Sequence, residues 1–63
     1  MRVEKARILI RKNRFRSYEV AKKIGVAPSN FSLWFRDEET MTEARLKKIE
    51  DAVTRLLEEE SNV

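Results

Sequence analysis

The chain has 63 residues and a formal net charge of +3, and it contains neither cysteine nor histidine. That length suits one domain with one small core, and the missing residue types exclude disulfides, zinc sites of the usual Cys/His kind and nucleophiles activated by histidine. The apolar run at 8–10 is too short for a signal peptide or a membrane span, so we expect a cytoplasmic protein. Because the chain lacks these reactive and metal-binding residue types, we also expect that it is not an enzyme and needs no cofactor or metal.

The first predicted helix covers about residues 2–12. Its apolar stripe at helical spacing consists of Val3, Ala6, Leu9 and Ile10. We expect Asn13 to end this helix, because asparagine tolerates a left-handed backbone. Phe15 lies in the short connection that follows, where we expect it to fill part of the core.

The second predicted helix begins at Ser17, which we interpret as its N-cap, and carries Glu19 in its first turn, where a carboxylate suits the helix dipole. Its buried residues are expected to be Val20, Ala21 and Ile24. Gly25 is the only glycine and is expected to end the helix with a positive φ. Pro28 then suits the first turn of a third helix. The short break predicts that the two helices cross steeply.

The fourth predicted helix covers about residues 43–60. With Thr42 as its N-cap, Met41 and Leu46 would form a hydrophobic staple across the first turn. Thr40 could instead form a capping box with the glutamate three residues later, which leaves the start open by two residues. The apolar stripe of this helix consists of Leu46, Ile49, Val53, Leu56 and Leu57. No segment of the chain is typical of a strand, so the predicted fold is a small all-α, four-helix domain spanning residues 1–63.

Charge is distributed unevenly along the chain. Residues 1–36 carry ten Lys or Arg and two acids, for a net charge of +8, whereas residues 37–63 carry four basic and nine acidic residues, for a net charge of −5. This asymmetry favours one surface that meets a polyanion and another that stays in solvent. A charge-rich surface that is simply solvated is the alternative.

The third predicted helix, 28–36, has an aromatic face and a polar face. Phe31, Trp34 and Phe35 fall within a sector of about 100° on the buried side. The opposite side carries Ser29, Ser32, Leu33 and Arg36, with Pro28 and Asn30 at its edges. Serine and asparagine can reach base edges in the DNA major groove, and leucine can contact a thymine methyl group. A polar face without a partner is the alternative.

The segment "SYEVAKKIGVAPSNFSLWFR", residues 17–36, resembles the twenty-residue helix-turn-helix of the lambda-repressor-like (Xre/Cro-type) family. That pattern has a small residue at its fifth position, glycine at its ninth, and apolar residues at its fourth, eighth, tenth, fifteenth and eighteenth. The matching residues here are Ala21, Gly25, Val20, Ile24, Val26, Phe31 and Trp34. The chain is especially similar to short regulators of phages or mobile elements of Gram-positive bacteria.

The resemblance implies a sequence-specific transcriptional regulator, a repressor of a phage or mobile element, whose third helix enters the major groove of double-stranded DNA. The implied base-reading residues are Ala27, Pro28, Ser29, Asn30, Ser32 and Leu33. The implied phosphate contacts come from Arg14, Arg16, Ser17, Tyr18 and Arg36. A helix N-terminus favours phosphate through its free N–H groups and its dipole, which suits Ser17.

Two features of the chain depart from the family pattern. The loop after the third helix reads "DEET", and its acids Asp37, Glu38 and Glu39 would repel phosphates. We expect this loop to be held away from DNA or the affinity to be modest. The base-reading face also lacks the arginine and glutamine that make strong bidentate contacts. The acidic loop favours an alternative function, a protein-interaction adaptor or anti-repressor that uses the same helix against a protein partner.

The last helix also bears on the oligomeric state, because two-fold DNA sites suit dimers. Leu46, Ile49, Val53 and Leu56 follow a 3-4-3 spacing that could form a short coiled-coil seam in a homodimer. In the alternative interpretation the same stripe covers the core of its own chain. In that case the apolar surface left over for a dimer would lie near Leu56 and Leu57.

Overall fold

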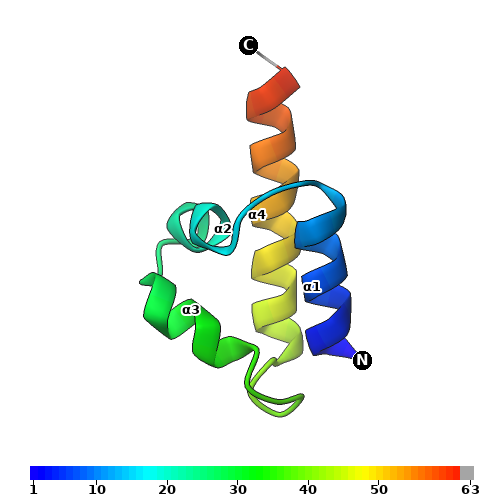
Figure 1. The fold of residues 1–63 in the computed structure, drawn as a ribbon, viewed down its shortest axis with the longest axis vertical. Coiled ribbons are helices and arrows are strands. Elements are labelled where there is room, and N and C mark those ends of the chain that lie inside the picture. Colours follow the sequence, from blue (N-terminus) through cyan, green and yellow to red (C-terminus); the bar gives the residue numbers. More distant parts are fainter. Residues whose placement is uncertain (62–63) are drawn as a thin grey trace.

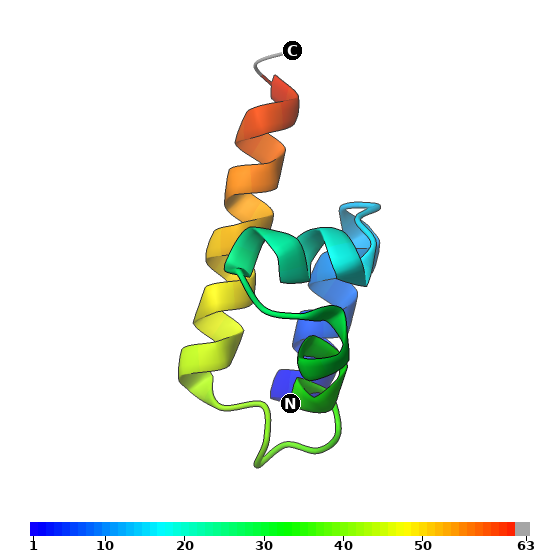
Figure 2. The ribbon, with the colours of Figure 1, turned by 90° about the vertical axis from the view of Figure 1, so that its left-hand side faces the viewer.

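The computed structural model describes residues 1–61, in which four α-helices and no strand are present. The helices are α1 (Arg2–Lys12), α2 (Ser17–Ile24), α3 (Pro28–Trp34) and α4 (Glu43–Ser61). This confirms the all-α prediction. α1 and the first half of α4 lie side by side and run in the same direction, and α3 lies below α2 at the edge of the molecule (Figure 1). α2 runs across α1 and α4 (Figure 2). The last turns of α4 project beyond the other three helices (Figure 2).

α1 ends at Lys12 with Asn13 as its C-cap, as predicted, but the left-handed residue is Arg14 and not Asn13. Asn13 caps the helix with a φ of −91°, and Arg14 takes the left-handed conformation with a φ of 62°. The Asn13 side chain donates a hydrogen bond to the Leu9 carbonyl at 2.8 Å. The backbone N–H groups of Arg14 and Phe15 bond the carbonyls of Arg11 and Ile10 at 3.0 and 3.1 Å. This is a Schellman motif, in which the residue after the cap is the left-handed one.

The start of α2 also differs, because Arg16 and not Ser17 is its N-cap. Arg16 has an extended backbone, and its N–H donates to the Glu19 carboxylate at 3.0 Å, so Ser17 is the first helical residue. Gly25 ends α2 with a φ of 96°, as predicted. A Cβ at this position would meet no atom within 4 Å, so it is the backbone angle that favours glycine here.

α3 begins at Pro28, as predicted, but ends at Trp34 and not at Arg36. The N–H groups of Phe35 and Arg36 bond the carbonyls of Ser32 and Leu33, three residues back, at 3.2 Å each. The helix therefore tightens into a 3₁₀-type turn before the chain leaves it.

The start of α4 is settled by Thr42, whose hydroxyl accepts the backbone N–H of Arg45 at 3.2 Å. Met41 and Leu46 are both buried on either side of this cap, which agrees with the predicted staple. Thr40 is not the cap, because its own N–H and hydroxyl donate to the Asp37 carboxylate at 2.8 Å.

One core joins all four helices. It consists of Ala6, Ile10, Val20, Ala21, Phe31, Trp34, Met41, Leu46, Ile49, Ala52 and Val53. Phe15 is half-buried at its edge, as are Val3, Leu9, Ile24, Phe35 and Leu56. An ion pair between Lys23 and Glu59 joins the end of α2 to the projecting part of α4.

The apolar stripe of α4 serves this core. Leu46, Ile49 and Val53 are buried within their own chain, which contradicts the coiled-coil interpretation of that stripe. A side chain already covered by α1 and α2 cannot also form a seam with a second copy. Leu57 is exposed at the projecting end of the helix, which agrees with the alternative interpretation that apolar surface is left over there. No helix within residues 1–61 has the length and apolar character needed to cross a bilayer.

Candidate nucleic-acid interface

The aromatic face of α3 is held against the body of the domain. Phe31 and Trp34 are only 1% and 8% exposed, and Phe35 is half-buried. The Phe31 ring lies 5.4 Å from that of Trp34 and 5.1 Å from that of Phe35, in tilted and edge-on arrangements that aromatic rings favour. This confirms the predicted orientation of the helix. With only seven residues, α3 depends on this packing, since isolated helices of this length do not persist in water.

Two arginines from neighbouring helices pack on these rings. The guanidinium of Arg45 in α4 lies 5.2 Å from the centre of the Trp34 ring, and that of Arg7 in α1 lies 5.9 Å from the Phe35 ring. Each position is within the range of a cation–π contact. Arg45 also donates to the Thr40 carbonyl at 2.7 Å. The end of α3 is thus tied to both α1 and α4.

The opposite side of α3 is open to solvent. All six residues expected to read bases are exposed, namely Ala27, Pro28, Ser29, Asn30, Ser32 and Leu33. Leu33 is 56% exposed. Ser32 makes one long hydrogen bond, from its hydroxyl to the Pro28 carbonyl at 3.4 Å. The face therefore presents hydroxyl groups, an amide and an isobutyl group without bulky charge.

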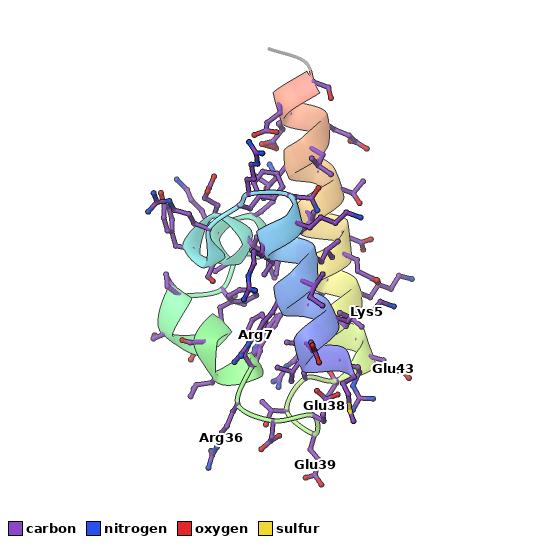
Figure 3. All side chains as sticks on the ribbon, turned by 45° about the vertical axis from the view of Figure 1, so that its right-hand side comes forward. Lys5, Arg7, Arg36, Glu38, Glu39 and Glu43 are labelled. Carbon is purple, nitrogen blue, oxygen red and sulfur yellow. The ribbon has the colours of Figure 1, made fainter. Side chains whose placement is uncertain are left out.

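The residues expected to contact phosphate lie at the two ends of this face. Arg14, Arg16, Ser17 and Tyr18 are exposed at the corner between α1 and α2, whereas Arg36 lies just beyond α3. Figure 3 shows Arg36 pointing away from the body. Arg16, Ser17 and Tyr18 line a groove together with Pro28 and Ser32 of the base-reading set. Arg14 and Arg36 do not line that groove.

Two basic residues outside the predicted set also line this groove, Arg7 and Arg11 of α1. Figure 3 shows Arg7 reaching from α1 toward the end of α3. Their spacing of four residues, which places them one above the other on a helix, was the available sequence signal. The sequence alone does not show which neighbour that side of α1 faces, so it does not identify the two arginines as part of the interface.

The acidic loop is largely engaged within the fold. The Glu38 carboxylate accepts hydrogen bonds from the backbone N–H groups of Val3, at 2.7 Å, and of Arg2. These bonds, with that of Val3 first, hold the pKa of Glu38 below its usual value. In return, the Arg2 side chain donates to the backbone carbonyls of Glu38 and Met41. The loop is thereby fastened to the start of α1, and Figure 3 shows Glu38 turned toward that helix.

Asp37 is engaged in the same loop. Hydrogen bonds from the backbone N–H and the hydroxyl of Thr40 lower the pKa of the Asp37 carboxyl group. Glu39 is exposed and points outward in Figure 3. Of the three carboxylates, only that of Glu39 accepts no hydrogen bond within the described part of the chain.

Comparisons with known proteins add no relative, since no family model, curated protein or solved structure matches the chain. Within residues 1–61 no group of three or more acidic side chains is arranged to hold a metal ion.

Proposed function

We propose that the protein is a sequence-specific DNA-binding regulator that inserts α3 into the major groove. The observation that carries this proposal is the exposed polar face of α3 on a helix whose other face is locked into the core. A helix that only covered a core would carry lysine and glutamate on its outer side, as α4 does. Small hydroxyl and amide side chains with one leucine allow a close approach to base edges.

The arrangement of α2 and α3 supports the same proposal. The short connection through Gly25 and Val26 turns the chain so that the start of α2 lies beside the first turn of α3. Ser17, at the start of α2, and Pro28, at the start of α3, line the same groove. In a helix-turn-helix, the first of the two helices meets the DNA backbone while the second reads bases. Ser17 and Tyr18 would offer a backbone N–H and a phenol hydroxyl to phosphate. Arg14, Arg16 and Arg36 would supply the positive charge.

The base-reading face predicts modest discrimination by a single copy. It has no arginine or glutamine for bidentate contacts, so specificity would come from Asn30, the serines, Leu33 and DNA shape. We therefore propose that two copies bind together on a two-fold site with half-sites about 34 Å apart. Because residues 17–36 resemble the helix-turn-helix of lambda-repressor-like regulators, we propose that the protein represses genes of a phage or mobile element.

A selection of bound fragments from random double-stranded DNA tests the proposal. We expect enrichment of a two-fold sequence. With roughly five phosphates neutralised per copy, the affinity for the selected duplex should fall with salt with a log–log slope of about −9 for a dimer. A library that stays random, or an affinity that does not change with salt, would contradict DNA binding.

The adaptor alternative has lost the feature that favoured it. The acidic loop suggested a protein partner, but Asp37 and Glu38 bond groups of their own chain. Asp37 and Glu39 remain exposed, and exposed acids are ordinary on a protein surface.

A further inference from the structure

A groove between α1, α2 and α3 has an apolar floor. Phe15, from the connection between α1 and α2, and Phe35, from the end of α3, are both half-buried and line it. Ile10 and Phe31 lie beneath them and are buried. Tyr18 is 56% exposed at its side. Three aromatic rings thus remain partly open to solvent within one concave surface.

The rim of this groove is strongly basic. Arg7, Arg11 and Arg16 line it, and no acidic residue does. Arg7 and Arg11 stand one turn apart on α1, a spacing at which like charges repel each other. Neither side chain has an ion-pair partner among the residues that the structure describes. The Arg7 guanidinium is fixed over the Phe35 ring, so it is already oriented at the edge of the groove.

An occupant that suits both floor and rim must be apolar and acidic at once. A DNA backbone would satisfy the arginines, but it has no large apolar group that could fill the groove over Phe15 and Phe35. A peptide with an aromatic residue or leucine between carboxylates satisfies both features, because arginine pairs with carboxylate through two parallel hydrogen bonds. We propose that the groove binds an acidic segment of a partner protein, with an apolar side chain on Phe15 and Phe35 and carboxylates on the three arginines.

Such a segment would compete with DNA. The groove is also lined by Ser17, Tyr18, Pro28 and Ser32, all of which belong to the proposed DNA contacts. A peptide seated there would cover the start of α2 and the first turn of α3. The partner would therefore release the protein from its DNA site. This regulatory consequence rests on the proposed function, whereas the binding of the peptide does not.

The test is a selection of short random peptides displayed on phage against the whole chain. We expect enriched peptides in which Asp and Glu flank leucine or an aromatic residue. A synthetic copy of the most enriched peptide is then measured against Arg7→Gln/Arg11→Gln. Loss of two charged hydrogen-bonding partners should weaken its binding by at least about tenfold. The matched control is Lys5→Gln/Lys12→Gln, which removes the same charge from residues of α1 that do not line the groove and should leave the affinity unchanged.

Folding of each variant is checked by circular dichroism, and Arg11→Gln alone is the second variant. In residues 1–61 the Arg11 side chain makes no hydrogen bond or ion pair, so its loss breaks no polar contact of the fold. Enrichment of peptides without acids, or equal affinity for the groove and control variants, would overturn the proposal. A third outcome would also overturn the proposal: the groove variant binds the acidic peptide as tightly as the unmodified protein does, but its affinity for DNA depends less on salt. That outcome would assign the arginines to the DNA backbone.

A competition experiment separates this inference from the proposed function. The peptide is added to the protein bound to a fluorescent duplex from the DNA selection, and we expect the duplex to be released. A peptide that binds through Arg7 and Arg11 without releasing the duplex would overturn the competition. If the unmodified protein binds no duplex, the proposed function fails, and the peptide measurement still decides the groove.

Discussion

Glu38 and Val3 are joined by a hydrogen bond of 2.7 Å between the Glu38 carboxylate and the Val3 backbone N–H, across 35 positions of the chain. The same carboxylate accepts the N–H of Arg2. These are among the N–H groups that the first turn of a helix leaves without a partner. A residue of the α3–α4 loop therefore caps α1, and it places a negative charge where the helix dipole favours one. The acidic loop that looked unfavourable for DNA binding has a structural role.

The first prediction concerns this cap. Glu38→Ala should lower the melting temperature, because it leaves the start of α1 without its acceptor and releases the loop. Glu39→Ala is the matched control, since it removes the same charge from a neighbour that points outward. Thermal unfolding followed by circular dichroism measures both. Equal melting temperatures for the two variants would show that the cap does not contribute.

The second prediction concerns pH. The carboxyl groups of Asp37 and Glu38 have pKa values lowered from 3.8 and 4.5 by hydrogen bonds that exist only in the folded chain. Groups with a lowered folded-state pKa stabilise the fold above their unfolded pKa, and this contribution is lost as pH falls through the folded value. Urea unfolding should therefore show stability falling below pH ~4.5. Glu38→Gln should show a smaller fall, and an unchanged one would contradict the role of Glu38.

The third prediction concerns the anchoring of α3. Trp34→Ala should remove most of the folded population, because loss of a buried tryptophan costs about 3–5 kcal/mol against a total stability of about 5 kcal/mol at the low end of small domains. The neighbouring Leu33→Ala removes an exposed side chain and should change stability by less than about 0.5 kcal/mol. Circular dichroism at 25 °C and urea titration compare the two. A folded Trp34→Ala variant of full helicity would contradict the anchoring.

The fourth prediction concerns phosphate contact. If Arg36 pairs with a DNA phosphate, Arg36→Ala should weaken binding by a similar factor on every duplex and reduce the salt slope by about one per copy. Fluorescence anisotropy at several salt concentrations measures both quantities. Lys47→Ala, which removes an exposed charge from α4, is the control and should leave the slope unchanged. An effect confined to one duplex sequence would assign Arg36 to a base instead.

The fifth prediction concerns base reading. Leu33→Ala and Ser29→Ala should alter which sequences are recovered from random DNA, while the affinity for non-specific duplex stays as it was. Leu33 contributes an apolar contact suited to a thymine methyl group, so its loss should relax a preference for thymine. Recovery of the same sequences by both variants and the unmodified chain would show that α3 does not read bases.

Local patterns in the chain were enough to find all four helices. The apolar spacing of residues 2–12 and 43–60, the positive φ at Gly25 and the proline that starts α3 depend on interactions within a few residues. So does the burial of Phe31 and Trp34, which follows from their position on one side of a short helix. Errors of one or two residues arose where backbone hydrogen bonds compete at a helix end, as at Arg14, Arg16 and Trp34.

The contacts between distant segments could be known only once the helices were packed. The capping of α1 by Glu38, the stacking of Arg7 on Phe35 and the groove shared by Arg11 and Ser17 join residues whose approach depends on how the loops turn. Periodicity says which side of a helix is buried, but it does not say which neighbour that side will meet. Helical structure and its buried face follow from short-range physics, whereas the partners of each charge depend on the path of the whole chain.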